Sequence, residues 1–229
     1  MGYSDSPLPM FSSLLASAII LFAHPQASFT GVFDREKLLA THSMSLDNRS
    51  QDRLVNEVFK ENIVLTLSYM RGNIHNGKAI EWAEVEQPFT STFSLKPGET
   101  FAFHDDVLPE YKGAIAKTTN AHFNFQEGFK SDGYLTGDGV CHLASLMYLV
   151  AKQTKLHVVA PTNHSFAQIP DIPAEFGVSI YHSGEKSTAN EVQNLYIKNT
   201  TDKDIVFEFG YNGKEVAFSI KGQDDIFAL

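Results

Sequence analysis

The single cysteine of this 229-residue chain lies where a glycine-rich turn meets a helical pattern. Cys141 follows Gly137 and Gly139, whose backbones can turn sharply and approach a ligand closely. The apolar residues after it keep helical spacing: Leu143, Leu146, Met147, Leu149 and Val150. A cysteine in the first turn of a helix feels the positive end of the helix dipole, which stabilises the thiolate. We therefore expect Cys141 to be a nucleophile, against the alternative of a small structural residue beneath the helix.

A thiol nucleophile needs a base that removes its proton. His164 follows a predicted strand at residues 156–160 and lies in a turn, from which its ring could reach the start of the Cys141 helix. The neighbouring Asn163 tolerates the left-handed conformation, and its amide could hold this loop. Together with the backbone of Gly139, we predict Asn163 to be part of a substrate-binding site, with Cys141 and His164 as its catalytic pair.

Metal binding is the competing use of these side chains. The chain has nine histidines, and His122, His142 and His164 could meet Cys141 in space. The sequence contains neither a His-x-x-x-His pair nor paired cysteines, which are the spacings typical of zinc sites. We therefore expect no metal and no cofactor. Asp105 and Asp106 follow a predicted strand, where a solvated turn is their commoner use.

Composition narrows the class of protein. Hydrophobic residues make up 43% of the chain, which is enough for a core. The formal net charge of -9 argues against nucleic acid as a partner and against electrostatic docking on anionic lipid. One cysteine excludes an intrachain disulfide.

The N-terminal third divides into two predicted parts. Residues 1–30 contain the apolar run Met10 to Ala23, which is shorter than the ~20 residues of a membrane span and fits the apolar region of a signal peptide or anchor. A buried N-terminal helix is the alternative, since no positive charge precedes the run. Residues 31–88 are predicted to form an N-terminal helical region: a connecting segment over 31–45, then an amphipathic helix from Ser50 to Arg71, stopped by Gly72. Ser50 is the expected N-cap residue of this helix, with Asp52 in its first turn.

From Phe89 the pattern is dominated by strands. Alternating or β-branched runs predict strands at 89–95, 100–103, 121–125, 156–160, 176–181, 194–199, 204–211 and 215–220. Tyr211-Asn212-Gly213 is typical of a hairpin turn. We predict that residues 89–229 form an α+β domain in which a central helix, starting at the glycine-rich cysteine turn and running to about Lys155, packs on an antiparallel sheet.

Four segments in this region resemble the signatures of VanW-like domains. They occur in the family's order and cover about residues 91–209: Phe93 to Phe103, the glycine-rich run into Val140-Cys141, Thr162-Asn163-His164-Ser165 with Pro170 to Pro173, and Asn194 to Asp202. Members of this family are associated with the bacterial cell envelope, some in glycopeptide-resistance clusters. The resemblance implies an extracytoplasmic protein, exported or membrane-anchored through its N-terminus.

The comparison with the family also assigns the remaining site residues. An aspartate follows the family's histidine, and this chain has Glu175 at that place, or Asp171 if the loop shifts; either acid could orient His164. The glutamine that follows the family's cysteine is His142 here, and a family histidine is replaced by Thr162. We therefore expect His142 and Asp171 to contribute to substrate binding and Glu175 to complete a catalytic triad.

Two functions remain open from the sequence. The first is a protein that acts on or binds a cell-wall peptide or glycan, by acyl transfer or amide hydrolysis if it is catalytic. The second is a non-catalytic envelope binding or scaffolding module whose cysteine is structural, which the replaced site residues favour.

Overall fold

The computed structural model describes residues 1, 36–74, 79–133 and 136–222. The chain separates into two units, residues 1–33 and 34–229, and the second contains the helices and strands described below. The apolar run Met10 to Ala23 and the predictions made from it lie outside the described residues. Among the described helices, none combines the length and the apolar character needed to cross a membrane.

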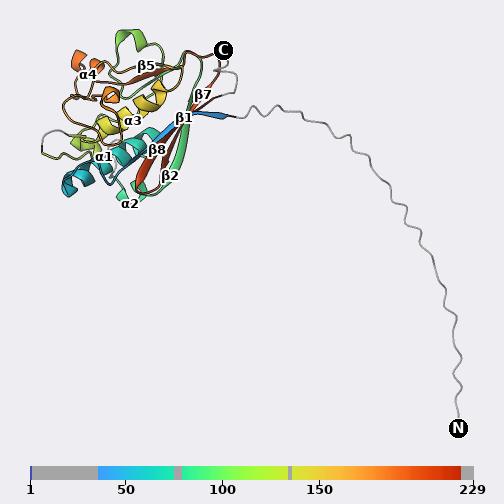
Figure 1. Cartoon of the computed structure of the whole chain (residues 1–229). Helices are drawn as coiled ribbons and strands as arrows, with labels where there is room; N and C mark the ends of the chain where they lie inside the picture. The colour runs from blue at the N-terminus through green and yellow to red at the C-terminus, as the bar shows by residue number, and fades with distance from the viewer. Residues whose placement is uncertain (2–35, 75–78, 134–135, 223–229) are drawn as a thin grey trace. The chain divides into compact units, whose positions relative to one another are not determined.

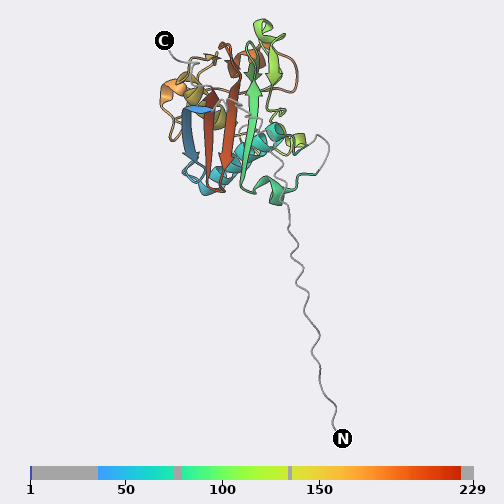
Figure 2. The ribbon, with the colours of Figure 1, turned by 90° about the vertical axis from the view of Figure 1, so that its right-hand side faces the viewer.

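The larger of two sheets is four-stranded and antiparallel, as Figure 2 shows. Its order is β1-β8-β7-β2, formed by Lys37–Ser45, Glu215–Gly222, Ile205–Tyr211 and Phe89–Leu95. Buried and partly buried residues alternate along β7, because successive side chains point to opposite faces of a sheet. The inward face is aromatic: the Phe93 and Phe207 rings lie 4.9 Å apart, and those of Phe209 and Phe218 4.6 Å. These pairs tie three adjacent strands into one core.

The smaller sheet has the order β4-β3-β6-β5. Its strands are short: Ile115–Lys117, Thr100–Ala102, Tyr196–Lys198 and His157–Val159. The β3 and β4 strands pair in parallel, whereas the other two pairs are antiparallel. This parallel pair departs from the purely antiparallel sheet expected from the sequence.

Two long helices complete the fold, α1 (Arg53–Arg71) and α3 (Val140–Lys152). The α3 helix contacts β1, β8 and α1, so a central helix covers the larger sheet (Figure 1). Short helices lie in the segments between these elements: α2 (Trp82–Val85), α4 (Thr188–Val192) and 3-10 helices at Pro109–Tyr111, Phe125–Glu127 and Ala174–Phe176. The arrangement confirms the predicted α+β class.

The helix boundaries differ slightly from the prediction. Asp52, not Ser50, caps α1, because its carboxylate accepts hydrogen bonds from the backbone N–H groups of Leu54 and Val55 at 2.8 and 3.2 Å. Gly72 ends α1 in the left-handed conformation, as expected, with φ 76°. The α3 helix ends at Lys152, three residues before the predicted Lys155.

Three strand assignments were wrong. Residues 37–45, predicted as part of a connecting segment, form β1 because β8 pairs with them from Lys37 to Ser45, with one irregularity between Leu38 and Ala40. Residues 121–125 do not form a strand, since Phe123 adopts φ 58°, outside the range of a strand. Residues 176–181 also form none; their backbone donates to scattered carbonyls, from Ser179 to Thr162 and from Tyr181 to Gln193.

Candidate functional site

A groove with a volume of about 800 Å³ lies at the N-terminal end of α3. Its walls come from five segments that are far apart in sequence: the start of α1, residues 123–126, the turn 136–142, the loop 164–168 and residues 180–184. We call it the α3 groove. Cys141, His142 and His164 all line it, so the structure brings these three predicted site residues to one place.

The glycine turn positions the start of α3 against α1. Gly139 is the N-cap residue of α3 and adopts φ 95°, a conformation that L side chains rarely take. A Cβ atom added there would lie 2.7 Å from the Phe59 Cα and 2.8 Å from the Phe59 carbonyl oxygen. Glycine is therefore required for the close approach of the two helices, which sets where Cys141 and His142 lie.

Cys141 is the second residue of α3, and its sulfur is engaged by the backbone of Ile180. The Ile180 N–H donates to Sγ at 3.3 Å, and the thiol donates to the Ile180 carbonyl at 3.7 Å. Burial raises the pKa of the thiol to about 11, and the nearby carboxylate of Asp138 acts in the same direction.

The surroundings of Cys141 do not support the expected stabilisation of a thiolate. A helix N-terminus contributes about 0.3–1 kcal/mol. This is less than the 1.36 kcal/mol that corresponds to one pKa unit. Desolvation of a charged sulfur outweighs that contribution, so Cys141 stays a neutral thiol that joins α3 to the segment around Ile180.

His164 is held by its own loop. Its Nδ1 donates to the Ala167 carbonyl at 3.1 Å, and its ring centroid lies 3.9 Å from that of Phe166. Burial lowers the pKa of His164, so the ring is neutral. In the part of the chain that the structure describes, no hydrogen bond joins His164 to Cys141, Glu175 or Asp171. The predicted triad is thus not assembled.

The two acids that were predicted to orient His164 are Glu175 and Asp171, and each lies in a different environment. Glu175 lies in the exposed 3-10 helix Ala174–Phe176. Asp171 forms an ion pair with the buried Arg49 and also accepts from the Asn48 amide. Arg49 donates in turn to the Pro170 carbonyl at 3.1 Å. Asp171 therefore anchors the loop to the segment before α1, and no hydrogen bond of the described residues joins it to the His164 ring.

The surroundings of Asn163 and His142, both predicted to bind substrate, are also specific to each residue. Asn163 donates to the carbonyls of Ala174 and Gly177 at 3.2 and 2.9 Å, so its amide holds the loop, and it is absent from the groove lining. His142 lines the groove, but its buried Nδ1 has no hydrogen-bond partner. Burial lowers the pKa of His142 to about 3, helped by the charge of Arg49 and by His164. This ring is neutral throughout the physiological range.

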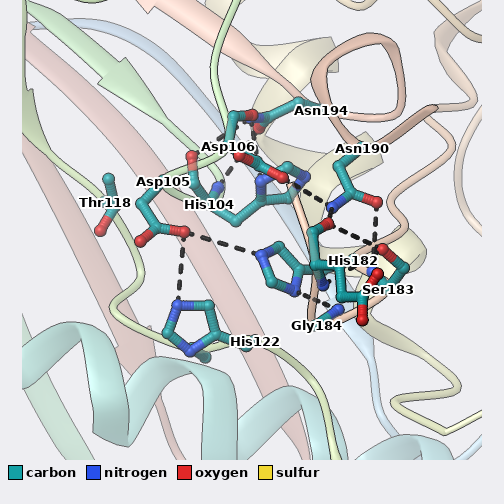
Figure 3. Close-up of polar contacts among 12 residues, drawn as sticks. His104, Asp105, Asp106, Thr118, His122, His182, Ser183, Gly184, Asn190 and Asn194 are labelled. Atoms are coloured by element: carbon teal, nitrogen blue, oxygen red, sulfur yellow. Dashed lines mark hydrogen bonds and ion pairs between the residues drawn. The ribbon is translucent and has the colours of Figure 1, made fainter. Parts of the chain in front are cut away.

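A second polar cluster, whose members the sequence did not indicate as a set, contains His104, Asp105, His122 and His182 (Figure 3). His122 was grouped with Cys141 in the sequence analysis, but it contacts Asp105 and the His182 ring instead. The four residues come from three separate loops, so no spacing along the chain marks them as a set.

Comparison with known proteins identifies the family. No curated protein and no solved structure shows significant similarity to this chain. The family described as VanW like protein matches residues 89–221, from the start of β2 to the last residue but one of β8, which is more than half of the chain. The matched region includes the glycine turn, Cys141 and His164. The chain therefore belongs to the VanW-like family.

Proposed function

We propose that this protein is an extracytoplasmic envelope protein that binds a peptide or glycan component of peptidoglycan in the α3 groove, with Cys141 in a structural role. One observation carries the choice of binding over thiol catalysis: the Cys141 sulfur is occupied by the backbone of Ile180 and its pKa is raised to about 11. Nucleophilic cysteines have a lowered pKa, which keeps the thiolate populated at neutral pH.

The size and lining of the α3 groove support binding. Ligand pockets typically have volumes of about 300–1,000 Å³ and a mainly apolar lining with a few polar groups. Three large apolar side chains on its wall are unusually exposed: Phe125 at 66%, Phe166 at 75% and Tyr181 at 39%. Exposed apolar side chains gathered in one place often mark an interaction site.

Polar groups in the same groove suit an uncharged or amide-rich ligand. Burial raises the pKa of Asp138 to about 6, so at neutral pH this group is mainly a carboxylate that accepts hydrogen bonds from hydroxyl or amide donors of a ligand. His142 is neutral and His164 has a lowered pKa. Sugar hydroxyls and peptide amides match such a lining, with aromatic faces available for the apolar sides of a sugar ring.

The envelope location rests on family membership. VanW-like proteins are associated with the bacterial envelope, and the apolar run Met10 to Ala23 supplies a segment for export or anchoring. The ligand class follows from that location, since peptidoglycan is the peptide-bearing glycan of this compartment.

A cysteine hydrolase or acyltransferase is the second candidate. The observation in its favour is that Cys141, His142 and His164 line one groove. Catalytic hydrogen bonds can be loose without substrate and tighten in the complex. A bound acyl group would have to separate the sulfur from Ile180 and bring His164 to it.

Titration calorimetry of the full chain with purified muropeptides and disaccharide fragments tests the proposal. Phe166→Ala should weaken binding about tenfold, which corresponds to 1.4 kcal/mol. Leu38→Ala is the matched control, because Leu38 is also an exposed apolar residue, on β1 and outside the groove. Cys141→Ser should leave the affinity within about twofold.

Mass spectrometry of the same mixtures separates the two candidates. Unchanged fragments after long incubation support binding alone. Cleaved or transferred fragments that disappear with Cys141→Ser would replace the binding proposal by cysteine catalysis. Absence of binding to every fragment, or equal losses in Phe166→Ala and Leu38→Ala, would refute the α3 groove as the site.

A further inference from the structure

Four potential metal ligands converge beside the α3 groove (Figure 3). His104 and Asp105 follow β3, His122 lies between β4 and the 3-10 helix Phe125–Glu127, and His182 precedes α4. One ligand atom each of His104, Asp105 and His182 lies within 4.8 Å of the others. The cluster shares no side chain with the Cys141 and His164 pair, so it can be considered separately.

The distances to Asp105 match those between ligands of one metal ion. His122 Nε2 lies 3.3 Å and His182 Nε2 3.8 Å from Asp105 Oδ1. Zinc–nitrogen and zinc–oxygen bonds of about 2.0–2.2 Å in a tetrahedron place neighbouring ligand atoms about 3.4 Å apart. Both observed distances are close to this value.

His104 has the tautomer that a metal ligand needs. Its Nε2 donates to the Gln193 carbonyl at 3.1 Å, which leaves the lone pair on Nδ1. The Asn194 amide lies 3.3 Å from Nδ1, but it also has two backbone carbonyls, of His104 and Asp106, as acceptors for its two protons. Burial lowers the pKa of His104 to about 4, so the ring is neutral.

His122 has the carboxylate support that is common for metal-bound histidines. Its Nδ1 is 2.7 Å from Glu127 Oε1, and its backbone N–H donates to the other oxygen of Glu127. Such a partner fixes the ring orientation and directs Nε2 toward the ion. The hydrogen bond to Glu127 raises the pKa of His122 to about 9, so a metal ion would displace a proton here.

His182 requires a local change. Its Nδ1 accepts a hydrogen bond from the Gly184 N–H at 3.1 Å, which places the proton of the neutral ring on Nε2. Coordination through Nε2 moves that proton to Nδ1 and breaks the bond to Gly184. Gly184 is exposed with no atom within 4 Å of an added Cβ, so its peptide has room to turn away.

The neighbouring Asp106 is not part of the set. Its Oδ2 accepts from the Asn190 amide at 2.7 Å and from the Ser187 backbone at 3.4 Å. It is buried, whereas the Asp105 side chain is 64% exposed and gives an ion access from solvent. Two adjacent acids therefore have separate roles, one in holding the loop before α4 and one facing the histidines.

We propose that His104, Asp105, His122 and His182 bind one divalent transition-metal ion of the zinc class. Three imidazoles and one carboxylate form a ligand set that suits Zn²⁺, whereas Mg²⁺ and Ca²⁺ prefer oxygen ligands. Because His182 also lines the α3 groove, the bound ion lies at the groove wall, where expansion to five ligands lets it contact an oxygen of a molecule in the groove.

Calorimetric titration of the metal-free full chain with Zn²⁺, and with Mg²⁺ in parallel, tests the proposal. We expect one Zn²⁺ per chain and no comparable Mg²⁺ binding. Asp105→Asn, His122→Gln and His182→Gln should each weaken Zn²⁺ binding about 10–100-fold, and Glu127→Gln about tenfold through His122. The matched controls His157→Gln and Asp202→Asn change a histidine and an aspartate outside the cluster and should stay within about twofold.

Two further measurements keep the result independent of variant folding. Circular dichroism checks each variant, and anomalous scattering from a crystal of the wild type soaked in Zn²⁺ locates the ion directly. A peak between the three rings and Asp105 supports the site. A wild type without Zn²⁺ binding, a peak elsewhere, or ligand variants that match the controls would overturn it, whether or not the groove binds peptidoglycan.

Discussion

The contact between Gly139 and α1 predicts an unequal effect of the same substitution at two glycines. Gly139 and Gly213 both adopt φ 95°. An added Cβ at Gly139 would meet Phe59 at 2.7 Å from Cα, 2.8 Å from the carbonyl oxygen and 2.9 Å from Cβ. At Gly213, in the turn between β7 and β8, no atom lies within 4 Å. A comparison of alanine at the two positions therefore separates the energetic cost of backbone strain from that of steric overlap.

The expected magnitudes follow from these two costs. Alanine in the left-handed region costs about 1–2 kcal/mol, and both variants carry this cost. Gly139→Ala also carries an overpacking cost of about 1–3 kcal/mol, because backbone atoms of Phe59 cannot move without separating α1 from α3. We expect Gly213→Ala to lose about 1–2 kcal/mol of unfolding free energy and Gly139→Ala to lose about 2–5 kcal/mol.

Urea unfolding of both variants and the wild type measures the difference. The midpoint should fall further for Gly139→Ala while the slope m stays constant, which shows that the free energy itself changed. Thermal melts should show a loss of about 2–4 °C for each kcal/mol in a domain of this size. Equal losses in the two variants would show that α1 does not press against the start of α3, and the geometry of the α3 groove would be wrong.

Three further predictions concern single polar side chains. The alkylation rate of Cys141 should rise with pH, with a midpoint near pH 11. Because the folded protein favours the neutral thiol, the stability of the wild type relative to Cys141→Ser should decline as pH rises from 9 to 11. An alkylation midpoint below about pH 8.5 would contradict this prediction. The pKa of His142 is lowered to about 3, so the wild type should lose stability relative to His142→Phe as pH falls from 6.5 to 3. A free energy of unfolding that changes equally with pH in the two proteins would contradict this prediction. Asn194→Ala removes the hydrogen-bond partner of the buried backbone N–H of His104 and of the buried carbonyl of Asp106. Urea unfolding should show a loss of about 2–6 kcal/mol of unfolding free energy. A loss below about 1 kcal/mol would refute this prediction.

Elements with a strong local pattern could be predicted from the sequence. The α1 helix has amphipathic spacing and a terminal Gly72, and the β7 and β8 strands alternate around the Asn212-Gly213 turn, so their main features follow from residues close together in the chain. The start of α3 after Gly139 follows in the same way. The family signatures are likewise contiguous segments, and the family match over residues 89–221 spans them and confirms the family.

Elements whose partners come from distant residues could not be predicted. The strand β1 has a weak pattern of its own and forms because β8, at least 170 residues later, supplies its hydrogen bonds. Residues 176–181 have a strand-like composition but find no continuous partner edge. Strand formation depends on pairing, and the sequence of one segment does not contain its partner.

For the candidate site, too, local features could be predicted from the sequence, whereas features that depend on distant residues could not. The residue types and the glycine turn placed Cys141 at a helix start and His164 in a loop nearby, and both line the α3 groove. The protonation of Cys141 was decided by tertiary structure, because desolvation depends on the surrounding chain and exceeds the local effect of the helix dipole. The meeting of Asp105, His122 and His182 was decided there too, since loops that are separate in sequence converge only when both sheets and α3 have packed.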